Sequence, residues 1–173
     1  MKWLVLICVL LNVNNEILVF DKAKQTKWYV TNDDVMGGIS TSSMIHKTSE
    51  NAVFSGEVST ENNGGFAMTR MRVNVKLDDK KSKIVLRVKG DGKKYQLRLK
   101  ADRSTRFWYI QSFQTNGKEQ EIEIPLTSFY PSFRGYRLNL DNFSSQTIKE
   151  IAILIGNKTN EKFKLEVEKI SIR

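Results

Sequence analysis

Strict alternation of apolar and polar residues recurs along most of this chain. In residues 71–77, apolar side chains at every second position alternate with Arg72, Asn74 and Lys76, and residues 84–89 and 95–100 follow the same pattern. Successive side chains of a strand point to opposite faces, so a period of two predicts strands with one buried face. No long run of apolar residues has helical spacing. The pattern therefore predicts an all-β protein.

Further strands are predicted at residues 107–113, 121–125, 151–156 and 163–173. In the last of these the apolar positions change parity after Val167, which predicts a β-bulge near Glu168 and Lys169. The sequence GDGKK at residues 90–94 predicts a hairpin turn between two strands. Residues 126–139, broken by Pro131 and Gly135, are expected to form a loop. Many antiparallel strands without helices favour a β-sandwich or jelly roll.

The 173 residues suggest one domain, because no linker or low-complexity stretch divides them. We expect a single β-sandwich domain at residues 17–173, preceded by an apolar N-terminal segment at residues 1–16. That segment has the character either of a signal sequence or of a first strand, so the protein is expected in the cytoplasm or, if the segment acts as a signal, outside it. No apolar stretch is long enough to predict a membrane span. The single cysteine, Cys8, excludes an internal disulfide.

Catalytic constellations are not recognisable in the sequence. The single histidine, His46, lies in a polar stretch far from Cys8, and no spacing typical of a zinc site or a phosphate-binding loop occurs. Asp33 and Asp34 would point to opposite faces of a strand, which is unsuitable for glycoside hydrolysis. A calcium ion held by Asp33, Asp34, Asn63 or Asp91 is a minor alternative. We expect no enzymatic activity, no cofactor and no metal.

Two polar turns each contain a pair of glycines next to a large apolar residue, NDDVMGGIS at residues 32–40 and ENNGGFAMTR at residues 61–70. Paired glycines permit positive φ angles and close approach of another backbone, and Asp side chains bond to nearby N–H groups in turns. One interpretation is a structural clasp, in which the two turns pack together and Arg70 reaches an aspartate. The other is a rim that binds a ligand. The sequence leaves both open.

The net charge of +9 favours acidic partners. Arg87, Lys89, Arg98 and Lys100 are predicted to point outward together on one hairpin, with Trp108 and Tyr109 following. Such a strand face is more often solvated than functional. Nucleic acid, if bound at all, is expected to bind weakly and without sequence preference, because no base-reading motif is present.

Five segments together resemble a known family: TNDDVMGGIS, FSGEVSTENNGGFAMTR, LRVKGDGKKYQLRL, IPLTSFYPSFRG and FKLEVEKISI, in that order. The chain resembles the complex I intermediate-associated protein 30 family, in the form of its bacterial single-domain members. The resemblance implies a galactose-binding-like jelly roll and an assembly-factor or chaperone-like role with a protein partner. The signature positions, taken as a candidate ligand or partner rim, are Asp33, Asp34, Met36, Gly37, Gly38, Asn63, Gly64, Gly65, Phe66, Arg70, Gly90, Asp91, Gly92, Arg134 and Gly135.

The fold implied by this resemblance also occurs in carbohydrate-binding modules, which stack sugars on exposed aromatic rings. Trp108 and Tyr109 alternate on a predicted strand, so one of them could face outward for this purpose. A carbohydrate-binding module is therefore the alternative function, and a hydrolase comes third.

Overall fold

The computed structural model describes residues 15–18, 28–47, 51–78 and 82–173. The N-terminal segment expected at residues 1–16 lies almost entirely outside the described residues, as does Cys8, so the nature of that segment stays a prediction. Among the described residues, no helix is long and apolar enough to cross a membrane.

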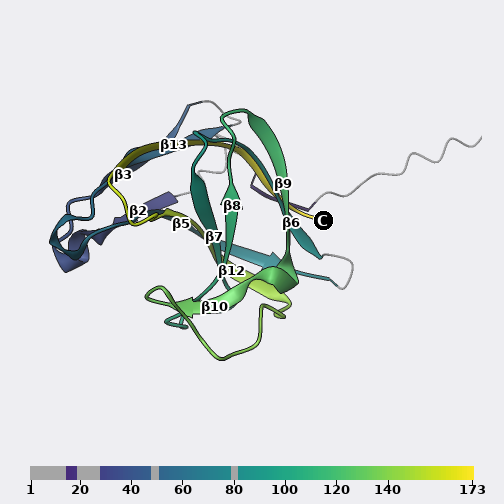
Figure 1. The fold of residues 1–173 in the computed structure, drawn as a ribbon. Helices are drawn as coiled ribbons and strands as arrows, with labels where there is room; N and C mark the ends of the chain where they lie inside the picture. The colour runs from purple at the N-terminus through teal and green to yellow at the C-terminus, as the bar shows by residue number, and fades with distance from the viewer. Residues whose placement is uncertain (1–14, 19–27, 48–50, 79–81) are drawn as a thin grey trace, which may run out of the picture.

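Two antiparallel sheets form the fold (Figure 1), which confirms the predicted all-β sandwich. The first sheet has six strands, with the order β3 (Thr41–His46), β4 (Ala52–Val58), β13 (Glu161–Ile172), β6 (Lys83–Lys89) and β9 (Glu119–Pro125), and with β1 (Asn15–Leu18) also paired to β13. The second has seven, in the order β11 (Tyr136–Arg137), β10 (Tyr130–Phe133), β8 (Trp108–Gln114), β7 (Lys94–Lys100), β12 (Thr147–Ile155), β5 (Ala67–Lys76) and β2 (Trp28–Asn32).

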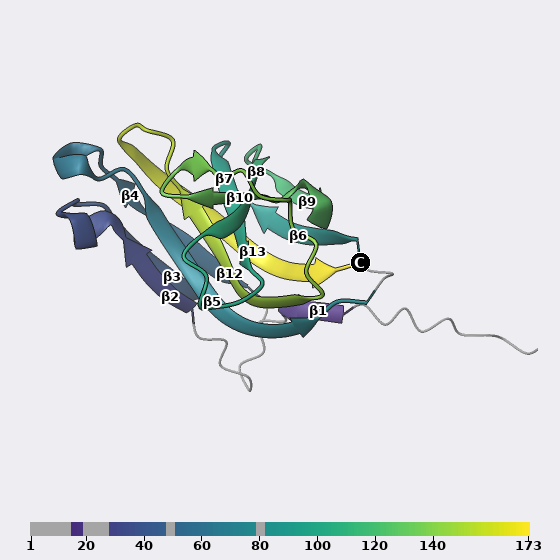
Figure 2. The same ribbon diagram turned by 90° about the horizontal axis from the view of Figure 1, so that it is seen from below.

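Three single turns of 3-10 helix interrupt the connections: η1 (Asp33–Met36), η2 (Glu61–Asn63) and η3 (Leu126–Ser128). The chain crosses from one sheet to the other through η1 and again through η2, because β2 and β5 belong to the seven-stranded sheet and β3 and β4 to the six-stranded one. Figure 2 shows these two turns close together at one end of the sandwich.

The hydrophobic core lies between the sheets and consists of the apolar side chains at alternate positions of the strands. On β7, Tyr95, Leu97 and Leu99 are fully buried and belong to the core. The ring of Tyr95 stacks on that of Phe113 from β8, with 5.8 Å between centroids. The other parity of the same strands therefore faces outward from the sandwich.

The β-bulge expected near Glu168 and Lys169 is confirmed. The pairing of β13 with β6 shifts register between Val167 and Lys169. The extra residue rotates the strand so that Ile170 and Ile172 face the core as Val167 does, and all three are buried.

The hairpin predicted at residues 90–94 is wrong. β6 pairs with β13 and β9, whereas β7 pairs with β8 and β12, so the turn carries the chain from one sheet to the other. Turn chemistry fixes only the local chain reversal. The two strands do not pair because β13 and β9 already occupy both edges of β6.

The segment 126–139 is not a plain loop. It contains η3 and the short hairpin of β10 and β11, in which Phe133 pairs with Tyr136. The two turn residues, Arg134 and Gly135, have φ angles of 50° and 85°. Positive φ at both positions is the geometry of a type I′ turn, which matches the twist of a hairpin.

Candidate functional site

The carboxylate of Asp33 joins the two double-glycine turns. It accepts hydrogen bonds from the Gly65 N–H at 2.6 Å and the Phe66 N–H at 3.2 Å, across the junction. It also accepts bonds from the Ser40 N–H at 3.0 Å and the Ser40 hydroxyl at 2.5 Å. Asp33 is only 2% exposed. The expected packing of the two turns is thus present, and Asp33 holds it together.

Glycine is required at two kinds of position in this clasp. Gly37 closes η1 with φ at 86°, and its N–H donates to the Asp34 carbonyl at 2.9 Å. A Cβ atom on Gly38 would overlap the Asp33 carboxyl, and a Cβ on Gly64 would stand 2.7 Å from Asp33 Oδ2. Both turns contain positive φ angles, at Gly37 and at Gly65, and both need room for the carboxylate.

Asp91 makes an equivalent junction at another crossover. Its carboxylate accepts hydrogen bonds from the Tyr95 hydroxyl at 2.9 Å, the Lys164 N–H of β13 at 2.9 Å and the Lys93 ammonium at 3.1 Å. The hydroxyl of Thr115, which follows β8, accepts a bond from the Gly92 N–H at 3.0 Å. Asp91 thus ties the β6–β7 crossover to both sheets.

Burial alone would raise the pKa of Asp33, but hydrogen bonds from Ser40, Gly65 and Phe66 outweigh it and hold the pKa below 3.8. At Asp91, burial would likewise raise the pKa, but the Lys164 N–H and Lys93 outweigh burial and lower the pKa. A depressed folded-state pKa means stability that is present above the unfolded-state pKa and is lost as the pH falls through the folded value.

The urea midpoint should therefore stay constant from about pH 7 to pH 5 and decline below about pH 4. Urea unfolding curves recorded across this range measure the decline. Asp33→Ala should show a smaller decline than the wild type, because one of the linked carboxylates is gone. Equal declines in the two proteins would contradict a depressed pKa at Asp33.

The signature positions do not form one continuous rim. Asp33, Asp34, Gly37 and Gly38 meet Asn63, Gly64, Gly65 and Phe66 at the clasp, and Met36 belongs to the same turn. Gly90, Asp91 and Gly92 form the separate crossover junction, and Arg134 and Gly135 form the β10–β11 turn. Arg70 does not reach an aspartate: its Nε donates to Glu150 Oε1 at 2.6 Å. Among the described residues, no three His, Cys, Asp or Glu side chains gather as a metal site would require.

The outer face of the seven-stranded sheet is rich in cations. Within the strands of this sheet, Glu150 is the single acidic residue. Its pairings place Arg70, Arg98 and Ala152 side by side, with Arg72, Lys100 and Glu150 in the next row. We call this surface the cationic face; its charged and aromatic side chains are Tyr29, Arg70, Arg72, Arg98, Lys100, Trp108, Tyr130, Arg137 and Glu150.

The expectation that Arg87, Lys89, Arg98 and Lys100 share one outward face is wrong. Because β6 and β7 belong to different sheets, Arg87 and Lys89 are exposed on the opposite side of the sandwich. Lys100 is 8% exposed, and its ammonium donates to the Thr105 carbonyl at 2.6 Å. The cationic face is thus partly desolvated, unlike an ordinary solvated strand face.

An indole ring lies at the centre of this face. Trp108 and not Tyr109 points outward: Trp108 packs on the apolar cluster of the outer face, whereas Tyr109 packs against the core. The Arg70 guanidinium lies 5.4 Å and the Lys100 ammonium 4.9 Å from the Trp108 centroid. Two cations therefore use the ring as a cation–π partner.

The aromatic residues at the two edges of the face also pair with arginines. The Arg72 guanidinium lies 5.8 Å from the ring of Tyr29, which is 46% exposed on β2. The Arg137 guanidinium lies 4.8 Å from the ring of Tyr130 on β10. Rings and cations thus alternate across the sheet.

Arg98 differs from the other cations of the face. Its Nε and Nη2 both donate to Gln96 Oε1, at 3.1 and 2.7 Å. Burial lowers the pKa of Arg98 to about 10, and Tyr130 opposes the shift only in part. Among the described residues, no carboxylate forms an ion pair with this guanidinium.

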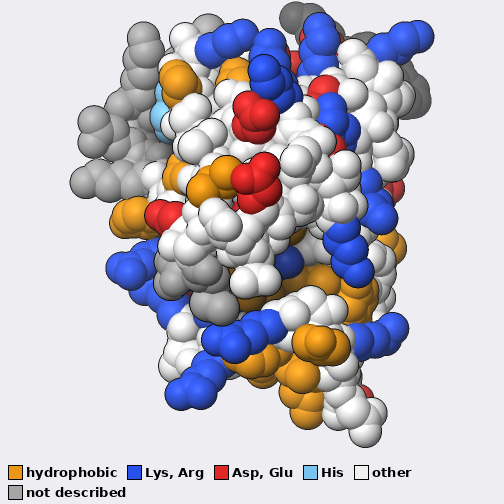
Figure 3. Space-filling view, turned by 60° about the vertical axis from the view of Figure 1, so that its left-hand side comes forward, with side chains coloured by type: hydrophobic (Ala, Val, Ile, Leu, Met, Phe, Trp, Pro, Cys, Tyr) orange, Lys and Arg blue, Asp and Glu red, His pale blue; other side chains and the backbone are white. Residues whose placement is uncertain are grey.

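Apolar side chains also lie on this outer face. Met68, Ala152 and Leu154 form a small buried cluster, the apolar patch, separate from the core and bordered by Phe66 and Trp108. Figure 3, with the β2 edge brought forward, shows hydrophobic side chains in a hollow flanked by Lys and Arg side chains. Beside the patch is a hollow of about 340 Å³, lined by Gln96, Ser112, Tyr130 and Leu154, with Lys94 and Lys158.

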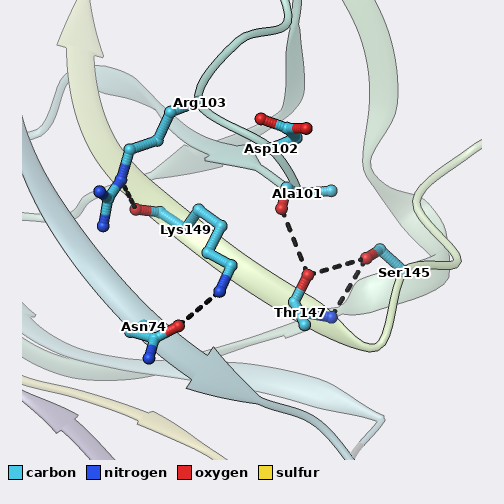
Figure 4. A pocket seen from close by; sticks show the side chains of 7 residues that line it. All are labelled: Asn74, Ala101, Asp102, Arg103, Ser145, Thr147 and Lys149. Carbon is cyan, nitrogen blue, oxygen red and sulfur yellow. Dashed lines mark hydrogen bonds between the residues drawn. The ribbon is translucent and has the colours of Figure 1, made fainter.

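A second hollow, of about 780 Å³, lies where β12 shifts register at Lys149 (Figure 4). The Lys149 ammonium donates to the Asn74 side-chain oxygen at 2.5 Å, and Arg103 Nε donates to the Lys149 carbonyl at 3.3 Å. Thr147 donates to the Ala101 carbonyl at 3.2 Å. Both cations here have partners within the fold, and these bonds hold the bulge.

Sequence reasoning did not identify Glu150, Gln96, Tyr29 or Tyr130 as part of a site. One signal was available: the strands predicted at residues 71–77, 95–100 and 107–113 contain no acidic residue, whereas acids are frequent in 119–123 and 161–168. The contrast is incomplete, because residues 84–89 of the six-stranded sheet also contain no acidic residue. It could not be used without knowing which strands pair.

Together the fold and this face define the protein as a galactose-binding-like β-sandwich domain whose open sheet carries cations and aromatic rings. The chain belongs to the complex I intermediate-associated protein 30 family, whose sequence pattern matches residues 18–167. It is 29% identical over 162 residues to the probable mitochondrial complex I intermediate-associated protein 30 of Caenorhabditis briggsae. It is 28% identical to that of Caenorhabditis elegans. Each alignment covers 78% of this chain and 46% of the relative, so the chain spans about half their length.

Among solved structures, the fold is similar to the family 11 carbohydrate-binding module from Clostridium thermocellum in complex with a β-1,3-1,4-mixed-linked tetrasaccharide. The TM-score is 0.65 at 17% identity, covering 92% of this chain and 95% of the module. Part of the agarase AgWH50C is also similar, with a TM-score of 0.57 at 8% identity, covering 91% of this chain and 24% of the enzyme. At these identities the likeness establishes the fold alone.

Proposed function

We propose that this chain is a non-enzymatic protein-binding domain that acts in assembly, and that it holds its partner on the cationic face. The observation that carries the proposal is the composition of this face: guanidinium groups and aromatic rings lie around a small apolar cluster, and Figure 3 shows hydrophobic side chains in a hollow flanked by Lys and Arg side chains. Protein interfaces are enriched in Arg, Tyr and Trp around an apolar centre.

The relatives support the assembly part of this proposal. Both are named as probable mitochondrial complex I intermediate-associated proteins. We propose that this chain shares with them a role in handling an incompletely assembled protein, and that a complex I intermediate is the first candidate partner to test. Of the signature positions, Phe66 and Arg70 border the partner site, while the clasp positions hold the two crossovers beside it.

Carbohydrate binding is the second candidate. The rings of Tyr29, Trp108 and Tyr130 all belong to the cationic face, and a carbohydrate-binding module of similar fold was solved with a bound tetrasaccharide. Sugars stack on open aromatic faces. Against this, the Trp108 ring already lies within cation–π distance of Arg70 and Lys100, so we place the protein partner first.

The paired substitution Tyr29→Ala with Arg72→Ala should weaken partner binding by about tenfold or more. Both side chains are exposed, so stability should change by less than about 0.5 kcal/mol each. The measurement is cross-linking and capture from cells, followed by titration of each identified protein, in purified form, with wild type and variant. The pair Ile45→Ala with Arg87→Ala, exposed on the other sheet, is the matched control.

A glycan array run with the same three proteins separates the two candidates. Titratable binding of a neutral oligosaccharide, lost in the Tyr29 and Arg72 variant and retained in the control, would replace the protein proposal by the carbohydrate one. Equal binding of a purified protein partner by both variants would remove the cationic face from either role.

A further inference from the structure

The charge distribution of the sandwich restricts the kind of partner that the cationic face can hold. The strands of the seven-stranded sheet carry one acidic residue, Glu150, against a set of cations: Arg70, Arg72, Lys76, Lys94, Arg98, Lys100, Arg137 and Lys149. The strands of the other sheet carry Glu57, Glu119, Glu121, Glu123, Glu161, Glu166 and Glu168 among their lysines and arginines. An acidic molecule is thus attracted to one side of the sandwich.

Within the cationic face, Arg98 is a partly buried arginine with no carboxylate partner among the described residues. Arg70 is paired with Glu150 at 2.6 Å, and the Lys100 ammonium donates to a carbonyl oxygen at 2.6 Å. Arg98 has only the neutral oxygen of Gln96, although burial has removed part of its water. A partly buried charge without a counter-ion is costly for the fold. An incoming carboxylate would supply the missing counter-ion in a bidentate geometry that suits arginine.

Apolar side chains lie directly beside this arginine. Ala152 pairs with Arg98 across β7 and β12, and Leu154 pairs with Gln96. Ala152 and Leu154 belong to the apolar patch, and Leu154 forms part of the wall of the 340 Å³ hollow. The patch itself is buried, so the apolar surface open to a ligand near Arg98 is that of the partly exposed Phe66 and Trp108 rings at its border.

We infer that the cationic face binds an acidic, partly apolar segment of a partner protein, whose carboxylate pairs with Arg98 while a neighbouring apolar side chain packs on the partly exposed rings of Phe66 and Trp108. This inference rests on the proposed protein-binding function and specifies the partner's chemistry. A neutral sugar leaves Arg98 without a counter-ion. Nucleic acid also offers anionic groups, so an oligonucleotide is one arm of the test.

The test uses short fluorescent peptides and the full chain. One peptide alternates glutamate and leucine, a second replaces every glutamate by glutamine, and a third replaces every leucine by serine. Fluorescence anisotropy should show binding of the first peptide and at least about tenfold weaker binding of the other two. A single-stranded oligonucleotide and a mixed-linked β-glucan tetrasaccharide are measured as competitors.

Arg98→Met, which keeps much of the aliphatic stem, should weaken binding of the acidic, apolar peptide by about tenfold or more. The same variant should unfold at the same or a higher urea concentration than the wild type, because it removes an uncompensated, partly buried charge. Arg87→Met on the other sheet is the matched control and should bind like the wild type. A purely structural arginine would instead give a lower urea midpoint.

Three outcomes overturn the inference: no binding of the first peptide at millimolar concentration, equal binding by Arg98→Met, or preferential binding of the oligonucleotide. Its failure can be told apart from that of the proposed function. Suppose that no peptide binds, but that binding of a purified protein partner still requires Tyr29 and Arg72. The proposed protein binding is then retained, and only the acidic, apolar chemistry of the partner is wrong. If that partner also binds independently of Tyr29 and Arg72, both the inference and the proposed role of the cationic face are wrong.

Discussion

Replacing Asp33 with alanine should lower the free energy of unfolding by about 3–4 kcal/mol, the largest effect expected from any polar residue in this protein. The carboxylate is 2% exposed and accepts bonds from Ser40, Gly65 and Phe66. Its removal leaves several backbone N–H groups without their acceptor at the place where two crossovers meet. Urea unfolding curves at neutral pH measure the loss.

Two further variants show whether the loss comes from the clasp. Asp33→Asn keeps the shape but replaces one acceptor oxygen by a donor and removes the charge, so it should also destabilise the protein, by about 2 kcal/mol. Asp141→Ala, in an exposed segment, is the matched aspartate control and should change stability by less than about 0.5 kcal/mol. If Asp33→Ala were as stable as Asp141→Ala, the clasp would have no energetic role.

Arg70→Ala should destabilise the fold by about 2–3 kcal/mol. Glu150 is 3% exposed, and the Arg70 Nε at 2.6 Å is its ion-pair partner, so the substitution leaves a buried carboxylate without its counter-ion. The loss is expected below that of a fully buried pair because the Arg70 side chain is 33% exposed. Chemical denaturation of the single variants and of Arg70→Ala with Glu150→Ala provides the measurement.

The double variant should cost less than the sum of the single variants by about 1–2 kcal/mol, because the second substitution removes the stranded charge. Lys83 and Glu123 form the matched control: their ion pair has the same 2.6 Å distance but 35% and 47% exposed side chains. Lys83→Ala should cost less than about 1 kcal/mol. Strict additivity at Arg70 and Glu150 would mean that the pair contributes nothing as a pair.

The clasp shows how much of a site can be predicted from local sequence. Two glycine pairs next to acidic residues predicted tight turns that pack together, and the positive φ of Gly37 and Gly65 confirms the expected conformation. The sequence could not show which of the two aspartates accepts the hydrogen bonds of the clasp. Asp33 and Asp34 are adjacent and differ only in the direction of their side chains. Asp33 points into the junction, while Asp34 is exposed.

The partner of Arg70 and the cationic face were beyond sequence reasoning for a related reason. Glu150 is eighty residues from Arg70 in the chain, and the two meet because β12 inserts between β5 and β7. Arg87 and Arg98 were expected on one hairpin, yet the chain crosses between sheets after β6 and places them on opposite sides. Which arginines share a face is therefore a property of strand order.

The sequence by itself determined most of the strands after residue 70, the parity of their side chains and the bulge at Glu168, because a period of two and its interruption are local properties of the chain. Tertiary structure alone decided which strands pair, where the crossovers lie, and that the outer face of one sheet gathers cations, rings and an apolar patch. The physical reason is that alternation fixes which side chains of a strand share a face. Which strands lie next to each other in a face is determined by long-range packing of the two sheets around the core, which includes Tyr95 and Leu97.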